Sequence, residues 1–234
     1  MTGTHDILGQ TVTMPVDVRD GSSATVIFDV ALDAARSLAP TGFEVIESAP
    51  GRAQFALALI DYKDNDLGAY LEVGTILFVR PEGGGEDGTF ITHLPVTEEF
   101  TCVAGNQIWG FPKSVERIEV TNTDTTSRWV LTMDGELVVD VTVPRGGSDE
   151  MAPMPLAAYT LIDGRPHVTR FTQGGSGSGL SMPADVVLTL GNHPVAKELA
   201  SLNLSAESAV LSTWTEHLQA RFEQPAALNP GLPG

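Results

Sequence analysis

Short runs of apolar and β-branched residues, separated by turn-forming segments, recur along this 234-residue chain. Their length and their Val, Ile, Thr and Phe content are typical of strands. We predict strands at residues 24–30, 53–59, 71–79, 89–94, 115–121, 128–133, 137–143 and 186–190. Glycine-rich or Asp-Gly turns lie at 80–88, 133–135 and 162–164, and Asp134-Gly135 between two strand-like runs indicates a hairpin.

Helical patterns are few. They cover residues 32–38, 195–202 and 206–222, and the second follows Asn192 or His193 as a possible cap with Pro194 in the first turn. Since strands dominate and helices flank them, the pattern predicts a mainly β (α+β) protein, an antiparallel barrel or sandwich with peripheral helices.

The composition of the loops and chain ends predicts how the chain divides into a domain and flexible segments. We expect a flexible N-terminal segment at 1–13, a single domain at 14–223 and a flexible C-terminal tail at 224–234. The segment 144–150 has the composition of a long loop. The glycine-rich segment 174–179 fits neither a dinucleotide-binding loop nor a serine-hydrolase elbow, so we predict a flexible loop there.

The charge and the cysteine content of the chain limit the partners, disulfides and metals that we expect. A formal net charge of −17 repels phosphate groups, so nucleic acid and anionic membranes are not expected. Cys102 is the only cysteine and the five histidines lack metal-ligand spacing, so we expect no disulfide and no metal. The N-terminus has no basic and apolar leader pattern, which favours a cytoplasmic location.

The segment that most strongly suggests catalytic chemistry is residues 105–114, Gly-Asn-Gln-Ile-Trp-Gly-Phe-Pro-Lys-Ser. Pro112 restricts Phe111 to extended conformations, which predicts a tight, non-helical bend at Lys113. Trp109 and Phe111 are suited to form apolar walls. The other two lysines differ, because Lys63 lies among three aspartates and residue 197 falls on a predicted surface helix.

A lysine with an ordinary pKa of about 10.4 is almost wholly protonated at neutral pH. Only the neutral amine is a nucleophile, and burial among apolar groups lowers the pKa of a lysine. The sequence therefore allows two interpretations: Lys113 is a buried amine with a lowered pKa, or its aromatic neighbours anchor a core turn while its ammonium group extends to solvent.

The run Gly-x-x-Ile-Trp-Gly-Phe-Pro-Lys resembles the signature of the acetoacetate decarboxylase-like family, in which the lysine after the proline forms a Schiff base. Residues 69–73 resemble the family strand that carries an active-site glutamate, and residues 190–194, Leu-Gly-Asn-His-Pro, resemble its C-terminal element. The resemblance spans about residues 14–204. It implies a cone-like, largely antiparallel β-barrel around a closed pocket, assembled as a homo-oligomer.

Carried over to this chain, the resemblance makes Lys113 the nucleophile and Glu72 the pocket carboxylate. Period-two alternation independently places Glu72 on one strand face with Tyr70, although an exposed Glu72 paired with an arginine is the alternative. Arg19 is the nearest candidate for the family arginine that pairs with this glutamate. Arg19, Trp109, Phe111 and Tyr70 are then the expected substrate-binding residues.

The implied reaction is the decarboxylation of a small 3-oxo acid through an iminium on Lys113, without metal or organic cofactor. Decarboxylases of the family commonly have a second lysine where this chain has Ser114. Two alternatives remain: a Schiff-base aldolase-dehydratase that acts on a 2-oxo acid such as pyruvate, and a non-catalytic barrel that binds a small ligand.

Overall fold

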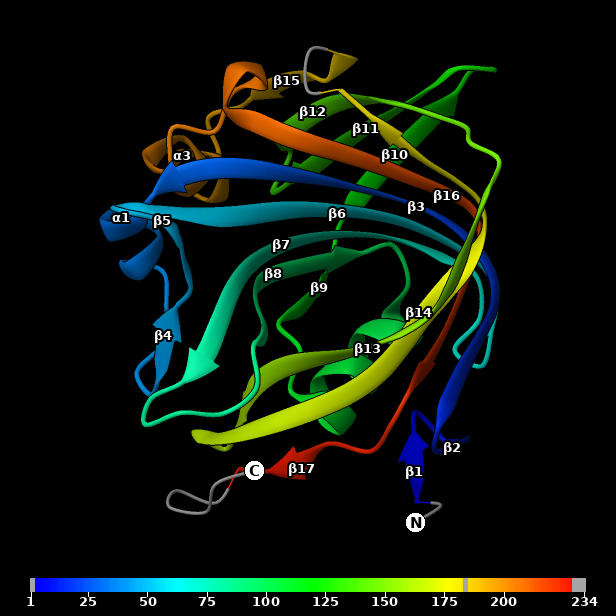
Figure 1. The fold of residues 1–234 in the computed structure, drawn as a ribbon. Helices are drawn as coiled ribbons and strands as arrows, with labels where there is room; N and C mark the ends of the chain where they lie inside the picture. The colour runs from blue at the N-terminus through cyan, green and yellow to red at the C-terminus, as the bar shows by residue number, and fades with distance from the viewer. Residues whose placement is uncertain (1–2, 183–184, 229–234) are drawn as a thin grey trace.

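The computed structural model describes residues 3–182 and 185–228, and long strands dominate it (Figure 1). The first half contains β1 (Thr4–Ile7), β2 (Gln10–Thr13), β3 (Val16–Ala31), α1 (Leu32–Arg36), β4 (Phe43–Val45), β5 (Glu47–Ala49), β6 (Arg52–Asn65), β7 (Tyr70–Pro81), β8 (Gly88–Val96), α2 (Glu99–Ala104), a π-helix (Gly105–Trp109) and β9 (Lys113–Val115). The second half contains β10 (Arg117–Asn122), β11 (Thr126–Met133), β12 (Glu136–Pro144), β13 (Asp149–Ile162), β14 (Arg165–Ser181), β15 (Val187–Leu190), α3 (Pro194–Ser201), a 3-10 turn (Ala206–Ser208), β16 (Ala209–Phe222) and β17 (Ala226–Ala227).

Seven strands close into a barrel in the order β7-β6-β3-β16-β14-β13-β8, because β8 also pairs with β7. Six of the seven pairings are antiparallel and the pairing of β13 with β8 is parallel. Figure 1 shows the long strands bending around the green segment that contains α2. The expected largely antiparallel β-barrel with peripheral helices is confirmed.

A separate four-stranded sheet, β10-β11-β12-β15, lies on one side of the barrel together with α3 (Figure 1). Its Trp129 shares one large apolar core with Phe28 of β3 and Leu57 of β6, and all three side chains are fully buried. Burying each such side chain contributes roughly 1.5–3 kcal/mol. The side chains of this core lie on one face of β6 and β7, and a second apolar cluster lies on their other face.

The eight predicted strand runs all fall on strands, and the first two predicted helices correspond to α1 and α3. The Asp134-Gly135 hairpin joins β11 to β12, with φ values of 51° and 78° that suit a tight two-residue turn. His193 caps α3, since its Nδ1 accepts a hydrogen bond from the Val195 amide at 3.2 Å.

The predicted helix at 206–222 is wrong. After one 3-10 turn the chain forms β16, which pairs with β3 on one side and β14 on the other. Leu211, Trp214 and Leu218 have helix-like spacing, but hydrogen bonding to two neighbouring strands outweighs this local preference.

The predicted flexible loop at 174–179 is also wrong, because these residues belong to β14 and pair with β16. Their glycines allow close backbone approach. A Cβ atom at Gly175 would lie 2.2 Å from the His217 carbonyl oxygen, and one at Gly174 would lie 2.8 Å from that of Met151.

Within the N-terminal segment 1–13, residues 4–7 and 10–13 form the β1–β2 hairpin, with Ile7 and Val12 buried. In the predicted C-terminal tail, β17 pairs with β14, and residues 229–234 lie outside the described part of the chain. Across residues 3–182 and 185–228, no helix combines the length and hydropathy needed to cross a membrane. In the same ranges, no group of three or more His, Cys, Asp or Glu side chains is arranged to hold a metal ion.

Candidate active site

Lys113 lies at the start of β9, directly after a three-residue turn centred on Pro112. The turn is closed by a hydrogen bond of 2.8 Å from the Lys113 amide to the Phe111 carbonyl oxygen. The fixed φ of proline suits the centre of such a turn. Strand β9 then pairs in parallel with β8, with Lys113 beside Leu94. The predicted tight, non-helical bend is therefore confirmed.

Glu72 reaches Lys113 from β7. Alternation along this strand puts Tyr70 and Glu72 on one face and Val73 and Leu77 on the other, in the main core. The Glu72 Oε2 atom lies 2.8 Å from Lys113 Nζ, and the two side chains are only 7% and 5% exposed. The structure thus contradicts both an exposed Glu72 paired with arginine and a Lys113 ammonium extended to solvent.

Three hydroxyl groups complete the surroundings of this ion pair. Lys113 Nζ donates to Thr101 Oγ1 at 3.1 Å and to Tyr70 Oη at 3.4 Å, and it lies 4.8 Å from the centre of the Tyr70 ring. The Tyr62 hydroxyl donates to Glu72 Oε1 at 3.2 Å, and the Tyr62 ring packs 4.5 Å from that of Tyr70. Each oxygen of Glu72 therefore has a partner, as a buried carboxylate requires.

The pKa of Lys113 differs from the lowered value expected for a buried nucleophilic lysine. Burial lowers the pKa of the ammonium, but the Glu72 carboxylate, together with Tyr70, more than offsets this effect and raises the pKa above its ordinary value of 10.5. The prediction of a lowered pKa is therefore wrong for this state. Burial also raises the pKa values of Tyr62 and Tyr70, with Glu72 adding to both, so these groups keep their protons at neutral pH.

Trp109 and Phe111 are buried and stack with their ring centres 5.9 Å apart. They belong to the same apolar cluster as Tyr62 and Tyr70. Trp109 is also anchored, because its Nε1 donates to the Glu223 carbonyl oxygen at 3.0 Å. The apolar walls around Lys113, and substrate binding by Trp109, Phe111 and Tyr70, stay predictions.

Arg19 does not pair with Glu72, which corrects the assignment by resemblance. Its guanidinium lies at the surface and contacts Asp64 at 2.7 Å and Asp66 at 2.6 Å. It sits where the register between β3 and β6 shifts, between Val18 and Gly21. Lys113 itself occupies the position of cationic partner to Glu72.

The sequence pattern did not single out Tyr62 or Thr101. Tyr62 directly faces Tyr70 in the β6–β7 register, so the strand pairing, once known, points to it. Thr101 is fully buried on the short helix α2. No local pattern marks it, since its contact with Lys113 depends on how α2 packs.

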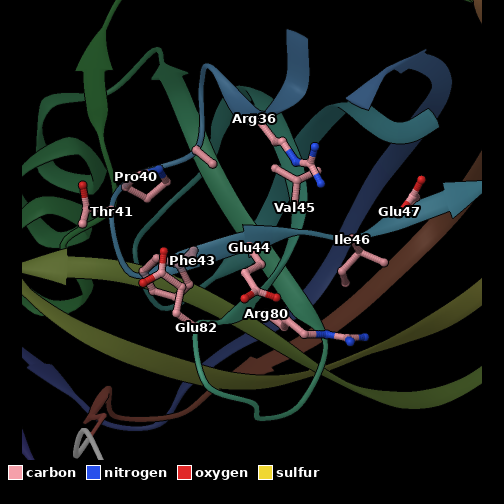
Figure 2. Close-up of a pocket in the computed structure, with 11 residues that line it drawn as sticks. Arg36, Pro40, Thr41, Phe43, Glu44, Val45, Ile46, Glu47, Arg80 and Glu82 are labelled. Atoms are coloured by element: carbon pink, nitrogen blue, oxygen red, sulfur yellow. The ribbon is translucent and has the colours of Figure 1, made fainter. Parts of the chain in front are cut away.

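Two hollows in the structure lie apart from this pair. One, of about 680 Å³, is lined by residues of α1, β4 and the end of β7, and Figure 2 shows Arg80 and Glu44 side by side in it. The other, of about 720 Å³, lies over β3, β14 and β16 and includes Arg19. Neither is lined by Lys113 or Glu72. We assign the candidate site by its chemistry, because among the described residues it alone holds a buried, potentially nucleophilic amine beside a carboxylate.

The fold and the site together define the class of this protein: it is a closed, mixed β-barrel with a buried lysine–glutamate pair. The family model for acetoacetate decarboxylase matches residues 8–226. The chain therefore belongs to the acetoacetate decarboxylase family. A search of curated proteins finds no match.

Several solved structures share the fold of this chain. The chain is similar to acetoacetate decarboxylase from Legionella pneumophila, with 16% identity, a TM-score of 0.70 and coverage of 92% of this chain and 87% of that one. It is also similar to the enduracididine biosynthesis enzyme MppR complexed with pyruvate, with 18% identity, a TM-score of 0.64 and coverage of 92% and 90%. An acetoacetate decarboxylase-like enzyme from Sphingomonas wittichii has 14% identity, a TM-score of 0.56 and coverage of 98% and 100%. At these identities the likeness shows the fold alone.

Proposed function

We propose that this protein is a Schiff-base-forming decarboxylase of a small 3-oxo acid, with Lys113 as the nucleophile. The observation that carries the proposal is the buried contact of 2.8 Å between Lys113 Nζ and Glu72 Oε2. A lysine rarely occupies such a position without a chemical role, because two buried charges stabilise a fold less than apolar groups of similar volume.

Glu72 supplies the first step, the removal of a proton from Lys113. Donor and acceptor are already within hydrogen-bond distance, so the proton can pass from Nζ to Oε2 without rearrangement. A substrate that enters the site excludes water from the pair, and in a drier site two neutral groups are favoured over two separate charges. The raised pKa of Lys113 then describes the resting state, and substrate binding activates it.

The neutral amine attacks the ketone carbon of the 3-oxo acid, and loss of water gives an iminium. The carbon–carbon bond to the carboxylate breaks, its electron pair moves to the iminium nitrogen to give an enamine, and carbon dioxide leaves. The proton that Glu72 accepted from Lys113 leaves with the water when the iminium forms, so the enamine carbon takes a proton from solvent by way of Glu72. Hydrolysis of the new iminium then releases the ketone and restores the Lys113 ammonium. Tyr70 and Thr101 hold the nitrogen during these steps by their hydroxyl groups.

The charge balance of the site favours decarboxylation over an aldolase-dehydratase reaction. Among the residues that the structure describes, Lys113 is the only Lys or Arg that contacts Glu72, Tyr62, Tyr70 or Thr101. A substrate carboxylate kept throughout the reaction therefore has no second cation to bind. In a site of low dielectric, loss of a carboxylate as neutral carbon dioxide removes an unfavourable charge.

Borohydride trapping with acetoacetate, and separately with pyruvate, tests the proposal. After reduction, peptide mass spectrometry identifies the modified lysine, and carbon dioxide release is measured in parallel without borohydride. We expect an acetoacetate adduct on Lys113 and release of carbon dioxide. Lys63 and Lys197 are exposed and serve as controls for nonspecific modification.

The other outcomes decide between the alternatives. An adduct with pyruvate alone, without release of carbon dioxide, would favour the aldolase-dehydratase. An unmodified Lys113 with both compounds would contradict Schiff-base chemistry on oxo acids and favour a non-catalytic binding barrel.

A further inference from the structure

The main chain of Lys113 lies at an edge of the sheet. β9 is the last strand in the order, and within residues 3–182 and 185–228 it pairs with β8 alone. Backbone groups on such an edge lack a neighbouring strand, and partly buried N–H and C=O groups need other partners. One side chain, that of Asn106, contacts both polar backbone groups of Lys113, and the Lys113 N–H shares its hydrogen bond between Asn106 and the Phe111 carbonyl oxygen.

The Asn106 amide reproduces the donor and acceptor of a missing strand. Its Oδ1 accepts a hydrogen bond from the Lys113 N–H at 2.9 Å, and its Nδ2 donates to the Lys113 carbonyl oxygen at 3.1 Å. Two hydrogen bonds to one residue restrict both its position and its orientation, which a single bond does not achieve.

Asn106 is itself held by a well-anchored segment. It lies in the π-helix that follows α2, and π-helical turns occur frequently at functional sites. The Trp109 carbonyl at the end of this turn accepts a hydrogen bond of 2.6 Å from Thr160 Oγ1 on β13. Gly110 then reverses the chain in the left-handed conformation with φ of 69°.

The helical segment made of α2 and the π-helix contacts Lys113 at two places, the Nζ atom and the main chain. Thr101 on α2 accepts a hydrogen bond from Nζ, while Asn106 holds the backbone. Between them, Gly105 leaves room for the aliphatic chain, because a Cβ atom there would lie 2.5 Å from Lys113 Cδ. The distance from Nζ to Glu72 therefore depends on how this segment holds the lysine.

We infer that Asn106 is a positioning residue for the nucleophile: its two hydrogen bonds to the Lys113 backbone keep Nζ in contact with Glu72. The inference deepens the proposed function and rests on it for its catalytic consequence. Its geometric consequence, the close contact with Glu72, is measurable whether or not an oxo acid reacts.

The test compares Asn106→Ala with Gln107→Ala. Gln107 is the neighbouring exposed amide in the same π-helix, and within the described residues its side chain forms no hydrogen bond that the structure records. Reductive methylation with formaldehyde and cyanoborohydride, followed by peptide mass spectrometry over a pH series, gives a midpoint for each lysine. Lys63 and Lys197 provide exposed internal references.

In Asn106→Ala we expect the Lys113 midpoint to move to lower pH, because a looser contact with Glu72 leaves the effect of burial less opposed. Trapping with acetoacetate should slow by about 10- to 100-fold, since misplacing a reacting group by about 1 Å has effects of this size. Gln107→Ala should match the wild type in both measurements. Asn106→Ser, which adds no charge and has one polar atom in place of two, should lie between them.

The inference is overturned if Asn106→Ala has the wild-type Lys113 midpoint and trapping rate. If Asn106→Ala does not fold, Asn106→Ser decides alone, and a wild-type midpoint there overturns it. If the wild type forms no adduct with acetoacetate or pyruvate, the proposed function fails, while the shift of the methylation midpoint still decides the role of Asn106.

Discussion

Two ion pairs in this protein have nearly the same length and very different surroundings. Lys113 and Glu72 lie 2.8 Å apart with side chains 5% and 7% exposed. Arg19 and Asp64 lie 2.7 Å apart with side chains 49% and 59% exposed. The first pair is hydrogen-bonded to Tyr62 and Tyr70, and the second is at the surface of the bulged end of β3.

The contrast shows that distance alone does not determine what an ion pair does. At the surface, water stabilises each charge separately, so pairing adds little. In the buried pair, each charge depends on the other, and loss of one leaves the other without water or counterion. A proton that moves from Lys113 to Glu72 neutralises both at once, which is the step that the proposed mechanism requires.

The largest effect is expected from Lys113→Met, which breaks the buried pair while keeping an apolar side chain of similar length. The acetoacetate adduct should be lost. The free energy of unfolding at pH 7 should fall by about 3 kcal/mol, the low end of the range for broken buried pairs. Urea unfolding followed by circular dichroism measures this change.

The double variant Lys113→Met/Glu72→Gln is the matched control. Removing the second charge should restore most of the lost stability without restoring the adduct. Equal stability of Lys113→Met and the wild type would show that the two charges do not depend on each other, and the contrast with the surface pair would then disappear.

The second prediction concerns Glu72→Gln and the pH dependence of Lys113. In the wild type, burial lowers the pKa of Lys113, but Glu72 with Tyr70 raises it by more. Without the carboxylate the effect of burial dominates, so the pKa should fall below its ordinary value and the methylation midpoint should move to lower pH. Carbon dioxide release should nevertheless fall by about 100-fold or more, because the proton acceptor is lost.

Asp64→Asn makes the same acid-to-amide change in the surface pair. It should leave the methylation midpoint of Lys113 and the release of carbon dioxide unchanged. A midpoint that moves to higher pH in Glu72→Gln would contradict the assigned role of the carboxylate.

The third prediction concerns packing around the buried lysine. Gly105 has φ of −59° and ψ of −45°, so alanine is compatible with its backbone and would normally stabilise a helix by up to about 1 kcal/mol. The contact of its Cβ with Lys113 Cδ should reverse this sign in Gly105→Ala, lowering the free energy of unfolding by about 1–3 kcal/mol. Trapping with acetoacetate should slow about tenfold.

A double-mutant cycle tests the cause. In a Lys113→Ala background the aliphatic chain is absent, so Gly105→Ala should become neutral or stabilising. A loss of stability that persists in this background would place the clash elsewhere.

The residues that the sequence identified correctly are those whose environment is set by near neighbours in the chain. Pro112 and its flanking aromatics marked the bend at Lys113, and period-two alternation placed Glu72 beside Tyr70 on one strand face. The eight strand runs were readable for the same reason. Their apolar patterns are local and persist in the fold.

The errors arose where distant segments decide the outcome. The helix-like spacing in β16 yielded to pairing with β3 and β14, and the glycine-rich part of β14 forms a strand because neighbouring backbones approach it closely. The raised pKa of Lys113 required the distance to Glu72, 41 positions away in the chain, since burial and the carboxylate act in opposite directions. Arg19 was misplaced because the bulges between Val18 and Gly21 are a property of the β3–β6 pairing.

The smallest effects are expected from Arg19→Ala, which removes the surface cation and leaves Lys113 untouched. Arg19 contacts only Asp64 and Asp66 among the acidic groups of the described residues, and all three side chains are well exposed. The variant should keep the wild-type rate of adduct formation with acetoacetate. Its melting temperature should differ from the wild type slightly at low salt, and the difference should vanish as salt screens the exposed charges. If Arg19→Ala instead weakened acetoacetate binding at every salt concentration, Arg19 would have to reach the substrate, and the separation between the surface pair and the buried pair would not hold.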